Sequence, residues 1–342
     1  MLKVKLNTEK LKRFNRDLIR SVLKEEGDGT TKSSLAFETG LSLSTCSNIL
    51  ADLEESGEIA VLGLEESRGG RRSRLYGYNH NFRSLALIYP ALEKRSVSLH
   101  ISVVNTAGEP LLEEIRYPGN ICGDDLISLS GELIERFENL SVLSFGMPAV
   151  VRKGVIGLCE MDRLSHFDLK GVLERKYAVA VSVGNDVNSA ALGYYDSLQS
   201  DSPESLVYLY YPEDGISGAG IIVNGRVLRG ERDFAGEISF LPLGTSPEKQ
   251  GKMQKNSRKF LEHLGKTILS VDCLINPGYI VINGNWFTAE FQEELLEKVE
   301  KSSPEGQSPI IRFDPHMDDS YRKGLFHRGM KQLSCGFEMI DL

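Results

Sequence analysis

Residues 42–78 read SLSTCSNILADLEESGEIAVLGLEESRGGRRSRLYGY, a pattern that predicts a short helix followed by a β-hairpin. Ser42 is a favourable N-cap, because its hydroxyl can accept a hydrogen bond from a backbone N–H of the first turn. Apolar residues then recur at helical spacing along one face, at Cys46, Ile49, Leu50 and Leu53. The opposite face carries the polar residues Ser44, Thr45, Ser47 and Asn48.

The predicted hairpin has a basic tip, Arg68-Gly69-Gly70-Arg71-Arg72. Its two glycines give the backbone the freedom that a tight turn needs, and its arginines could contact phosphates on either side of a DNA groove. An ordinary surface hairpin with solvated arginines would show the same pattern. The residues that precede this stretch favour the DNA-binding interpretation.

Residues 8–24 place apolar side chains three or four positions apart and predict a first helix. A second helix is expected over 33–38, closed by Gly40, since glycine suits the left-handed residue that follows a helix. Helix, helix, tight turn, helix and hairpin form a winged helix-turn-helix. We therefore expect residues 1–79 to bind DNA through the third helix and the wing, with contacts from Ser44, Thr45, Ser47, Asn48, Arg68, Arg71 and Arg72.

The composition sets outer bounds on the rest of the chain. Its 342 residues, 41% of them hydrophobic, are enough for two or three domains. Five cysteines without paired spacing predict a reduced interior rather than a disulfide framework. No apolar run reaches the roughly 18 residues of a membrane span, and the first residues lack the apolar core of a signal peptide. We therefore expect a cytoplasmic protein without membrane contact.

Charge is distributed unevenly. Through Arg74 there are 13 basic and 12 acidic residues, whereas the remainder has 27 basic and 36 acidic residues. An acidic body does not bind DNA by itself, so nucleic-acid contact should be confined to the winged module. Because that module is not strongly basic, we expect a homodimer, or a higher homo-oligomer, that binds two half-sites of an operator.

Beyond a polar joint at 79–83, short β-rich runs alternate with helical patterns. Strands are expected at 85–89, 97–104, 142–145, 178–183, 206–211, 220–223 and 279–282. Helices are expected at 126–140, 169–177, 187–198, 259–275 and 287–301. The alternation predicts an α/β body, and two β-rich halves split near residue 190 suit a two-lobed fold.

Three stretches in this body carry a family resemblance: VSVGNDVNSAALGYY (181–195), GISGAGIIVNGRVLRGERDFAGEISFLPLG (215–244) and LINPGYIVINGNW (274–286). In this order, behind a winged helix, they resemble the ROK family of repressors and sugar kinases. The resemblance implies that residues 80–342 form a two-lobed actin-like, sugar-kinase-like (ribonuclease H-like) domain around a sugar cleft. Lobe one would span about 80–190 and 321–342, including a C-terminal helix at about 321–333, and lobe two about 191–320.

The motifs that kinases of this family need are degraded. A phosphate-cradling Asp-x-Gly-Gly-Thr turn falls at residues 93–97, which lack both glycines and the threonine. A Gly-x-Gly-x-Gly loop reads ISGAG at 216–220, and a Pro-Gly-x-x-Asp motif reads PAVVR at 148–152. Phe240 replaces a zinc-binding histidine, and residues 241–255 contain no cysteine or histidine. We therefore expect no catalytic residue, no cofactor and no metal.

Polar residues are retained at the family's sugar-contacting positions. Asn185 and Asp186 match an Asn-Asp pair whose aspartate is the base in family kinases, and Glu237 matches the glutamate of a Gly-Glu-x-Gly-His motif. Amide and carboxylate groups together can bind vicinal hydroxyls, which suits a sugar or sugar-phosphate effector. The Asn185-Asp186 pair could also cap the helix that begins near Asn188, and Glu237 could pair with Arg229 or Arg232.

The sequence thus predicts a DNA-binding transcriptional regulator, a repressor of carbohydrate-related genes, whose partners are a double-stranded DNA operator and a small effector. An ATP-dependent sugar kinase is the alternative from another class of protein. A regulator whose body only dimerises is a third possibility.

Overall fold

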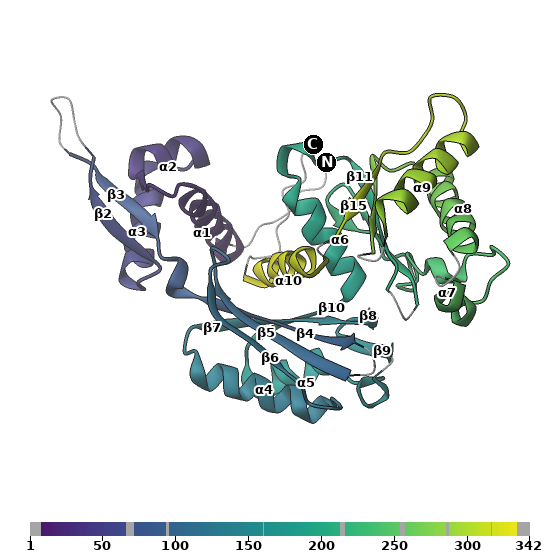
Figure 1. The fold of residues 1–342 in the computed structure, drawn as a ribbon. Coiled ribbons are helices and arrows are strands. Elements are labelled where there is room, and N and C mark those ends of the chain that lie inside the picture. Colours follow the sequence, from purple (N-terminus) through teal and green to yellow (C-terminus); the bar gives the residue numbers. More distant parts are fainter. Residues whose placement is uncertain are drawn as a thin grey trace.

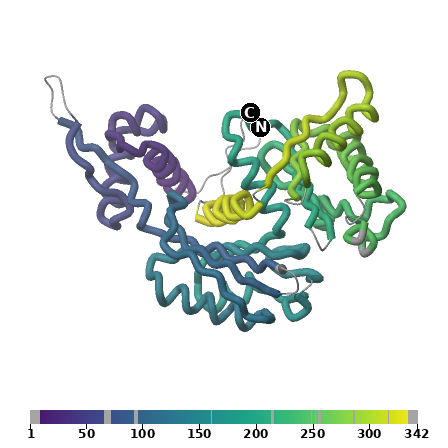
Figure 2. The backbone as a smooth tube through the Cα atoms, in the orientation of Figure 1, coloured from purple at the N-terminus to yellow at the C-terminus, as the bar shows by residue number. Residues whose placement is uncertain are grey.

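The computed structural model describes residues 8–65, 72–93, 96–159, 161–212, 216–253, 257–284, 287–315 and 317–333. They form an N-terminal module and two α/β lobes (Figure 1, Figure 2). The module lies beside the first lobe, at the end of the molecule away from the second lobe. Among the described residues, no helix combines the length and the apolar character required to cross a membrane.

The N-terminal module consists of three helices and a small antiparallel sheet of order β1-β3-β2. Its elements are α1 (Thr8–Glu25), β1 (Thr30–Thr31), α2 (Lys32–Thr39), α3 (Leu43–Glu55), β2 (Ile59–Leu64) and β3 (Arg74–Tyr78). The expected cap of the third helix is present, since Ser42 Oγ accepts a hydrogen bond from the Thr45 N–H at 3.1 Å. Gly40 has the expected left-handed conformation, with φ of 67°.

Apolar side chains from all three helices fill the core of this module. The buried residues are Ile19, Leu23, Leu35, Cys46, Leu50, Leu53 and Ile59. Burial of one face of α3 leaves its polar face on the outside, as amphipathic spacing requires.

Hydrogen bonds tie the module to the first lobe at the linker between β3 and β4. Asn81 Oδ1 accepts a bond from Asn105 Nδ2 at 3.0 Å, and the Asn81 carbonyl oxygen accepts one from Asn139 Nδ2 at 2.8 Å. The Thr106 N–H donates to the carbonyl oxygen of His80 at 3.1 Å. The expected polar linker is therefore held against the first lobe by hydrogen bonds.

The first lobe has a five-stranded mixed sheet of order β10-β7-β4-β5-β6. Its strands are β4 (Ser84–Glu93), β5 (Ser96–Asn105), β6 (Pro110–Arg116), β7 (Leu140–Met147) and β10 (Ala180–Asn185). Helices α4 (Gly123–Arg136) and α5 (Leu169–Tyr177) cover one face, and α10 (Met317–Leu333) covers the other (Figure 1). A hairpin of β8 (Ala149–Arg152) and β9 (Val155–Cys159) lies beside β10.

The second lobe repeats this plan with a sheet of order β13-β12-β11-β14-β15. Its strands are β11 (Ser205–Tyr210), β12 (Gly218–Val223), β13 (Arg226–Val227), β14 (Tyr279–Asn283) and β15 (Ile311–Asp314). Helices α8 (Ser257–Ile275) and α9 (Ala289–Ser302) pack on one face, near the short α7 (Pro247–Met253), and α6 (Asp186–Ser197) packs on the other.

Helices α6 and α10 cross in close contact, and two glycines permit it. A Cβ at Gly193 would lie 1.8 Å from the carbonyl oxygen of Ser320, and a Cβ at Gly324 would lie 1.8 Å from that of Ser189. Any larger residue at either position would force the helices apart. The diagnostic run at 185–193 therefore ends in glycine for a packing reason.

Several boundaries differ from those expected. The helix expected over 126–140 ends at Arg136, because Phe137 has an extended backbone (φ −123°, ψ 94°) and Leu140 begins β7. Strands β6, β13 and β15 were not predicted. They lie at sheet edges, where exposed polar residues weaken the strand pattern.

Candidate functional site

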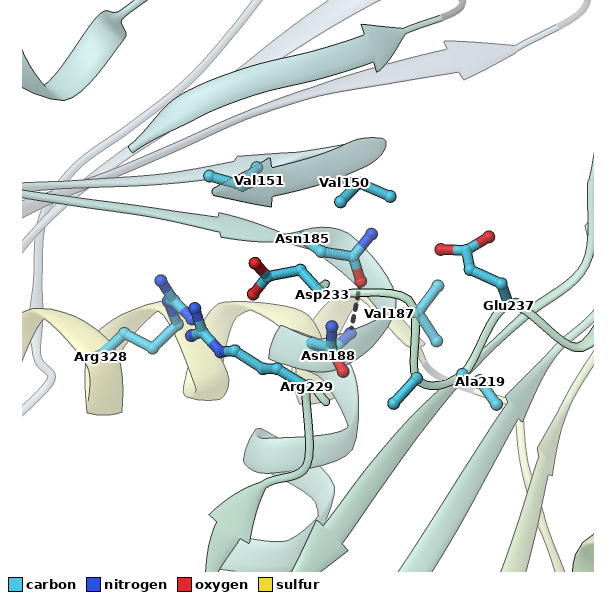
Figure 3. Close-up of a pocket in the computed structure, with 13 residues that line it drawn as sticks. Val150, Val151, Asn185, Val187, Asn188, Ala219, Arg229, Asp233, Glu237 and Arg328 are labelled. Atoms are coloured by element: carbon cyan, nitrogen blue, oxygen red, sulfur yellow. Dashed lines mark hydrogen bonds between the residues drawn. The ribbon is translucent and has the colours of Figure 1, made fainter. Parts of the chain in front are cut away.

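A cleft of about 500 Å³, counted with the open space at its mouth, lies between the two lobes (Figure 3). Its walls come from β8, the start of α6, β12, the loop at 229–237 and α10. The polar residues facing it are Asn185, Asn188, Arg229, Asp233, Glu237 and Arg328. Residues from both lobes and from the last helix therefore share one cavity.

Asn185 ends β10 and caps α6. Its Oδ1 accepts a hydrogen bond from the Asn188 N–H at 2.9 Å. Its Nδ2 donates to Asp186 Oδ1 at 2.8 Å and to the carbonyl oxygen of Ala149 at 3.3 Å. The expected helix cap is confirmed, and the second lone pair of Oδ1 is left for a ligand.

Asp186, the first residue of α6, lies just behind the cleft and is not one of its lining residues. Its Oδ1 accepts hydrogen bonds from the Val187 N–H at 2.8 Å and from Asn185. Burial, reinforced by the charge of Glu237, raises the pKa of Asp186 to about 7. The raised pKa favours the protonated carboxyl group, which can donate as well as accept hydrogen bonds.

Glu237 lies on the opposite wall, at the start of a one-turn 3₁₀ helix, and burial raises its pKa. In the described part of the chain no ion pair joins it to Arg229 or Arg232, so the alternative of a local pair is not realised. Its carboxylate can therefore accept hydrogen bonds from hydroxyl groups in the cleft.

The glycine-rich run at 216–220 leads into β12, where close packing requires Gly220. A Cβ at Gly220 would lie 2.7 Å from the carbonyl oxygen of Val187, and a Cβ at Gly236 would lie 2.0 Å from that of Ala219. Gly236 also has a left-handed φ of 96°. These contacts account for Gly220 and Gly236 without a bound phosphate.

Phe240, at the position of the family's zinc-binding histidine, packs against Phe234 with ring centroids 5.5 Å apart. Both rings are more than half exposed. Across the described residues, no group of three or more His, Cys, Asp and Glu side chains is arranged to hold a metal ion. Lys94 and Arg95, in the expected remnant of a phosphate turn, lie outside the described residues.

Arg328, on α10, lines the cleft and was not predicted from the sequence. Its Nη2 donates to the carbonyl oxygen of Val183 at 2.7 Å and to Ser182 Oγ at 3.3 Å. Gly184 makes room for it, because a Cβ there would lie 2.3 Å from the Arg328 guanidinium carbon. Burial, together with the charge of Arg229, lowers the pKa of Arg328 to about 10. In the sequence, the one sign of the contact between Arg328 and β10 is the glycine at position 184, which leaves room for a side chain.

The predicted DNA-contacting residues that the structure describes lie on the surface of the N-terminal module. Ser44, Ser47 and Asn48 are exposed on α3, and Thr45 is partly exposed. Arg72 is exposed on the hairpin, which extends away from both lobes (Figure 1). Arg68 and Arg71 lie outside the described residues.

Comparison with known proteins bears on family and fold. The model of the ROK family matches residues 98–251. The xylose repressor of Caldicellulosiruptor bescii is 28% identical over 243 residues, which are 67% of this chain and 58% of that protein. The chain thus spans less than two thirds of the length of this curated relative. These matches confirm the family resemblance seen in the sequence.

Two solved structures share the architecture. A ROK family transcriptional regulator, described as a homologue of the E. coli MLC protein, has a TM-score of 0.70 at 17% identity, covering 94% of this chain and 98% of its own. The ROK hexokinase of Thermus thermophilus has a TM-score of 0.59 at 19% identity, covering 74% of this chain and 100% of its own. They confirm the two-lobed α/β fold.

Proposed function

We propose that this chain, which carries a ROK family domain over residues 98–251, is a sugar-responsive transcriptional repressor. The observation that carries the proposal is the helical module attached to a sugar-kinase-like body. The regulator structure covers 94% of this chain, whereas the hexokinase covers 74%. The difference is close to the length of the N-terminal module. The relative from Caldicellulosiruptor bescii is named a xylose repressor, which supports a regulatory role linked to a sugar.

The module would bind a double-stranded operator through α3 and the hairpin. Ser44, Thr45, Ser47 and Asn48 have the hydrogen-bonding groups needed to contact base edges in a major groove. Arg68, Arg71 and Arg72 would contact phosphates on the flanking backbone. The acidic body repels DNA, so two modules of a homodimer on two half-sites would supply the affinity.

The cleft would bind the effector through Asn185 and Glu237, whereas Asp186, which the sequence predicted as a contact, lies behind the cleft and would orient Asn185 through their hydrogen bond. A structural connection between cleft and module supports regulation by this ligand. Helix α10 reaches the cleft with Arg328, and its Phe326 lies 3.8 Å from the position of a Cβ on Gly108. Gly108 belongs to the turn after β5, which bonds the linker of the module. An effector that shifts α10 would therefore move the module.

A sugar kinase is the second candidate, favoured by one observation. Asp186 stands at the position of the kinase base, and a pKa of about 7 suits a general base. The packing roles of Gly220 and Gly236 weigh against it, since these glycines are explained without a nucleotide.

Selection from a random duplex library with the full-length protein tests the repressor role. We expect a short inverted-repeat operator to emerge, and its affinity to change when a sugar of the effector class is added. A coupled assay with ATP and common pentoses and hexoses should remain at background. Failure to enrich any sequence, together with turnover that Asp186→Asn abolishes, would establish the kinase instead.

A further inference from the structure

Two arginines converge in the cleft from different parts of the fold. Arg229 follows β13 in the second lobe, and Arg328 lies on α10, which packs against the first lobe. Their guanidinium groups approach each other in Figure 3. Two like charges are therefore held close together at one end of the cleft, which is unfavourable unless an anion lies between them.

The hydrogen-bond acceptors around Arg328 are neutral. They are the carbonyl oxygen of Val183 and the hydroxyl of Ser182, while the Arg328 Nε is buried without a hydrogen-bond partner. Within the described residues, neither Arg229 nor Arg328 forms an ion pair. A buried donor without a partner requires an explanation, and a bound group that accepts hydrogen bonds is one.

The carboxylates around the cleft do not neutralise this pair. Asp233 lies 3.7 Å from Nε of Arg152. Asp186 uses Oδ1 to accept hydrogen bonds from Asn185 and from the backbone. Glu237 lies on the far wall, away from both arginines (Figure 3). The arginine end of the cleft is therefore positively charged.

The other end suits hydroxyl groups. The Glu237 carboxylate forms no ion pair in the described chain, and Asn188, which lies between Arg229 and Glu237 in Figure 3, has a buried Oδ1 without a partner. Asn185 Oδ1 has one lone pair to spare. The cleft thus joins a cationic end to a wall of hydrogen-bond acceptors.

We infer that the effector is a polyhydroxylated molecule bearing an oxyanion, such as a phosphorylated sugar or a sugar acid, and that its oxyanion binds between Arg229 and Arg328. A guanidinium group presents paired N–H donors that match the spacing of oxyanion oxygens. A bound anion would attract both guanidinium groups and so offset the repulsion between them. This inference rests on the proposed function, because it specifies the effector of the same cleft.

Calorimetry of the full-length protein without DNA, at constant ionic strength, tests the inference. The probes are inorganic phosphate and a panel of pentoses, hexoses and N-acetylhexosamines, with each sugar offered in its neutral form, as its phosphate ester and, where one exists, as its uronic acid. We expect phosphate to bind, and a charged sugar to bind at least about tenfold more tightly than its neutral counterpart. Comparison of the phosphate ester with the uronic acid shows whether the oxyanion is a phosphate or a carboxylate.

Arg229→Gln, at an exposed side chain, should fold normally and weaken binding of the charged probes about 10- to 100-fold while leaving neutral sugars unaffected. Arg328→Gln should do the same. Arg232→Gln, at an exposed arginine in the same loop that does not line the cleft, is the matched control and should retain wild-type affinity.

Three results would overturn the inference: neutral sugars that bind as tightly as charged ones, equal affinities for Arg229→Gln and Arg232→Gln, or no binding of any charged probe. Operator binding by the same protein samples is measured separately. Loss of operator binding would show that the repressor assignment is wrong. Failure of the effector inference can therefore be told apart from failure of the proposed function.

Discussion

Arg20 and Glu58, 38 residues apart, form a two-pronged ion pair inside the N-terminal module, with Nη2–Oε2 and Nε–Oε1 distances of 2.6 and 2.8 Å. Glu58 is only 2% exposed, and Tyr78 also donates to its Oε1, at 3.1 Å. The pair joins α1 to the start of β2, so the position of the hairpin relative to the helices depends on it.

Arg20→Met should open the module locally, because it leaves a buried carboxylate without its cationic partner, at a cost of about 3–5 kcal/mol. Hydrogen exchange of peptides from α1 and β3 in the full chain measures this local free energy. Arg16→Met removes the exposed pair with Asp52 and should cost no more than about 1 kcal/mol. Equal effects of the two substitutions would show that the Arg20–Glu58 pair has no special importance.

Asp186 should make the unliganded protein less stable as pH rises from about 4 to about 7. Its pKa is raised in the folded protein to about 7, so the folded state holds a proton that the unfolded state releases, and the associated stability is lost over this range. Asp186→Asn should gain about 1–4 kcal/mol relative to wild type at pH 7 and nothing at pH 4. Thermal denaturation across this range measures the difference, and parallel curves for the two proteins would contradict it.

Gly324→Ala should destabilise the crossing of α6 and α10, because its Cβ would meet the carbonyl oxygen of Ser189. We expect a loss of about 1–3 kcal/mol, the range typical of overpacking. Gly265→Ala in α8 is the matched control, since its Cβ would contact only the flexible side chain of Lys298, at 3.3 Å. That control should be neutral or stabilising by up to about 1 kcal/mol. Chemical denaturation compares both with wild type.

Asn105→Ala should weaken the coupling between effector and operator, because it removes the bond from Asn105 Nδ2 to Asn81 in the linker and the three bonds by which the same side chain holds the turn after β5. Operator affinity without effector should change little, whereas the effector-induced change should fall by about 1 kcal/mol or more. Asn120→Ala, whose side chain bonds the neighbouring Ile121 N–H and no other residue of the described ranges, should respond as wild type. An undiminished response in Asn105→Ala would exclude this route. Anisotropy titrations with labelled operator provide the measurement.

Arg71→Ala with Arg72→Ala should lower affinity for all duplexes and reduce the slope of log affinity against log salt by about one for each phosphate that the protein no longer neutralises. Asn48→Ala should instead reduce the preference for the selected operator over random DNA. Lys301→Ala, an exposed cation on α9 in the second lobe, should leave both quantities unchanged. A salt slope that does not respond to the double arginine change would place DNA contact elsewhere.

Features that depend on nearby residues were predictable from the sequence. The cap at Ser42, the left-handed Gly40 and the amphipathic α1 and α3 each follow from interactions within a few positions. The Asn185-Asp186 pair was expected to cap the following helix for the same reason, and Asn185 is the residue that does so. The helix expected over 126–140 was too long because apolar spacing alone does not reveal where Phe137 leaves the helical conformation.

The sequence by itself therefore determined the local elements, the family resemblance and the identity of Asn185 and Glu237 as residues near a cleft. Only the tertiary structure decided that α10 returns to the first lobe and brings Arg328 beside Arg229. It also placed Asp186 behind the residues that line the cleft, where burial raises its pKa. The physical reason is that charge repulsion, burial and close helix contact depend on distances between residues remote in the chain, which the folded arrangement of both lobes sets.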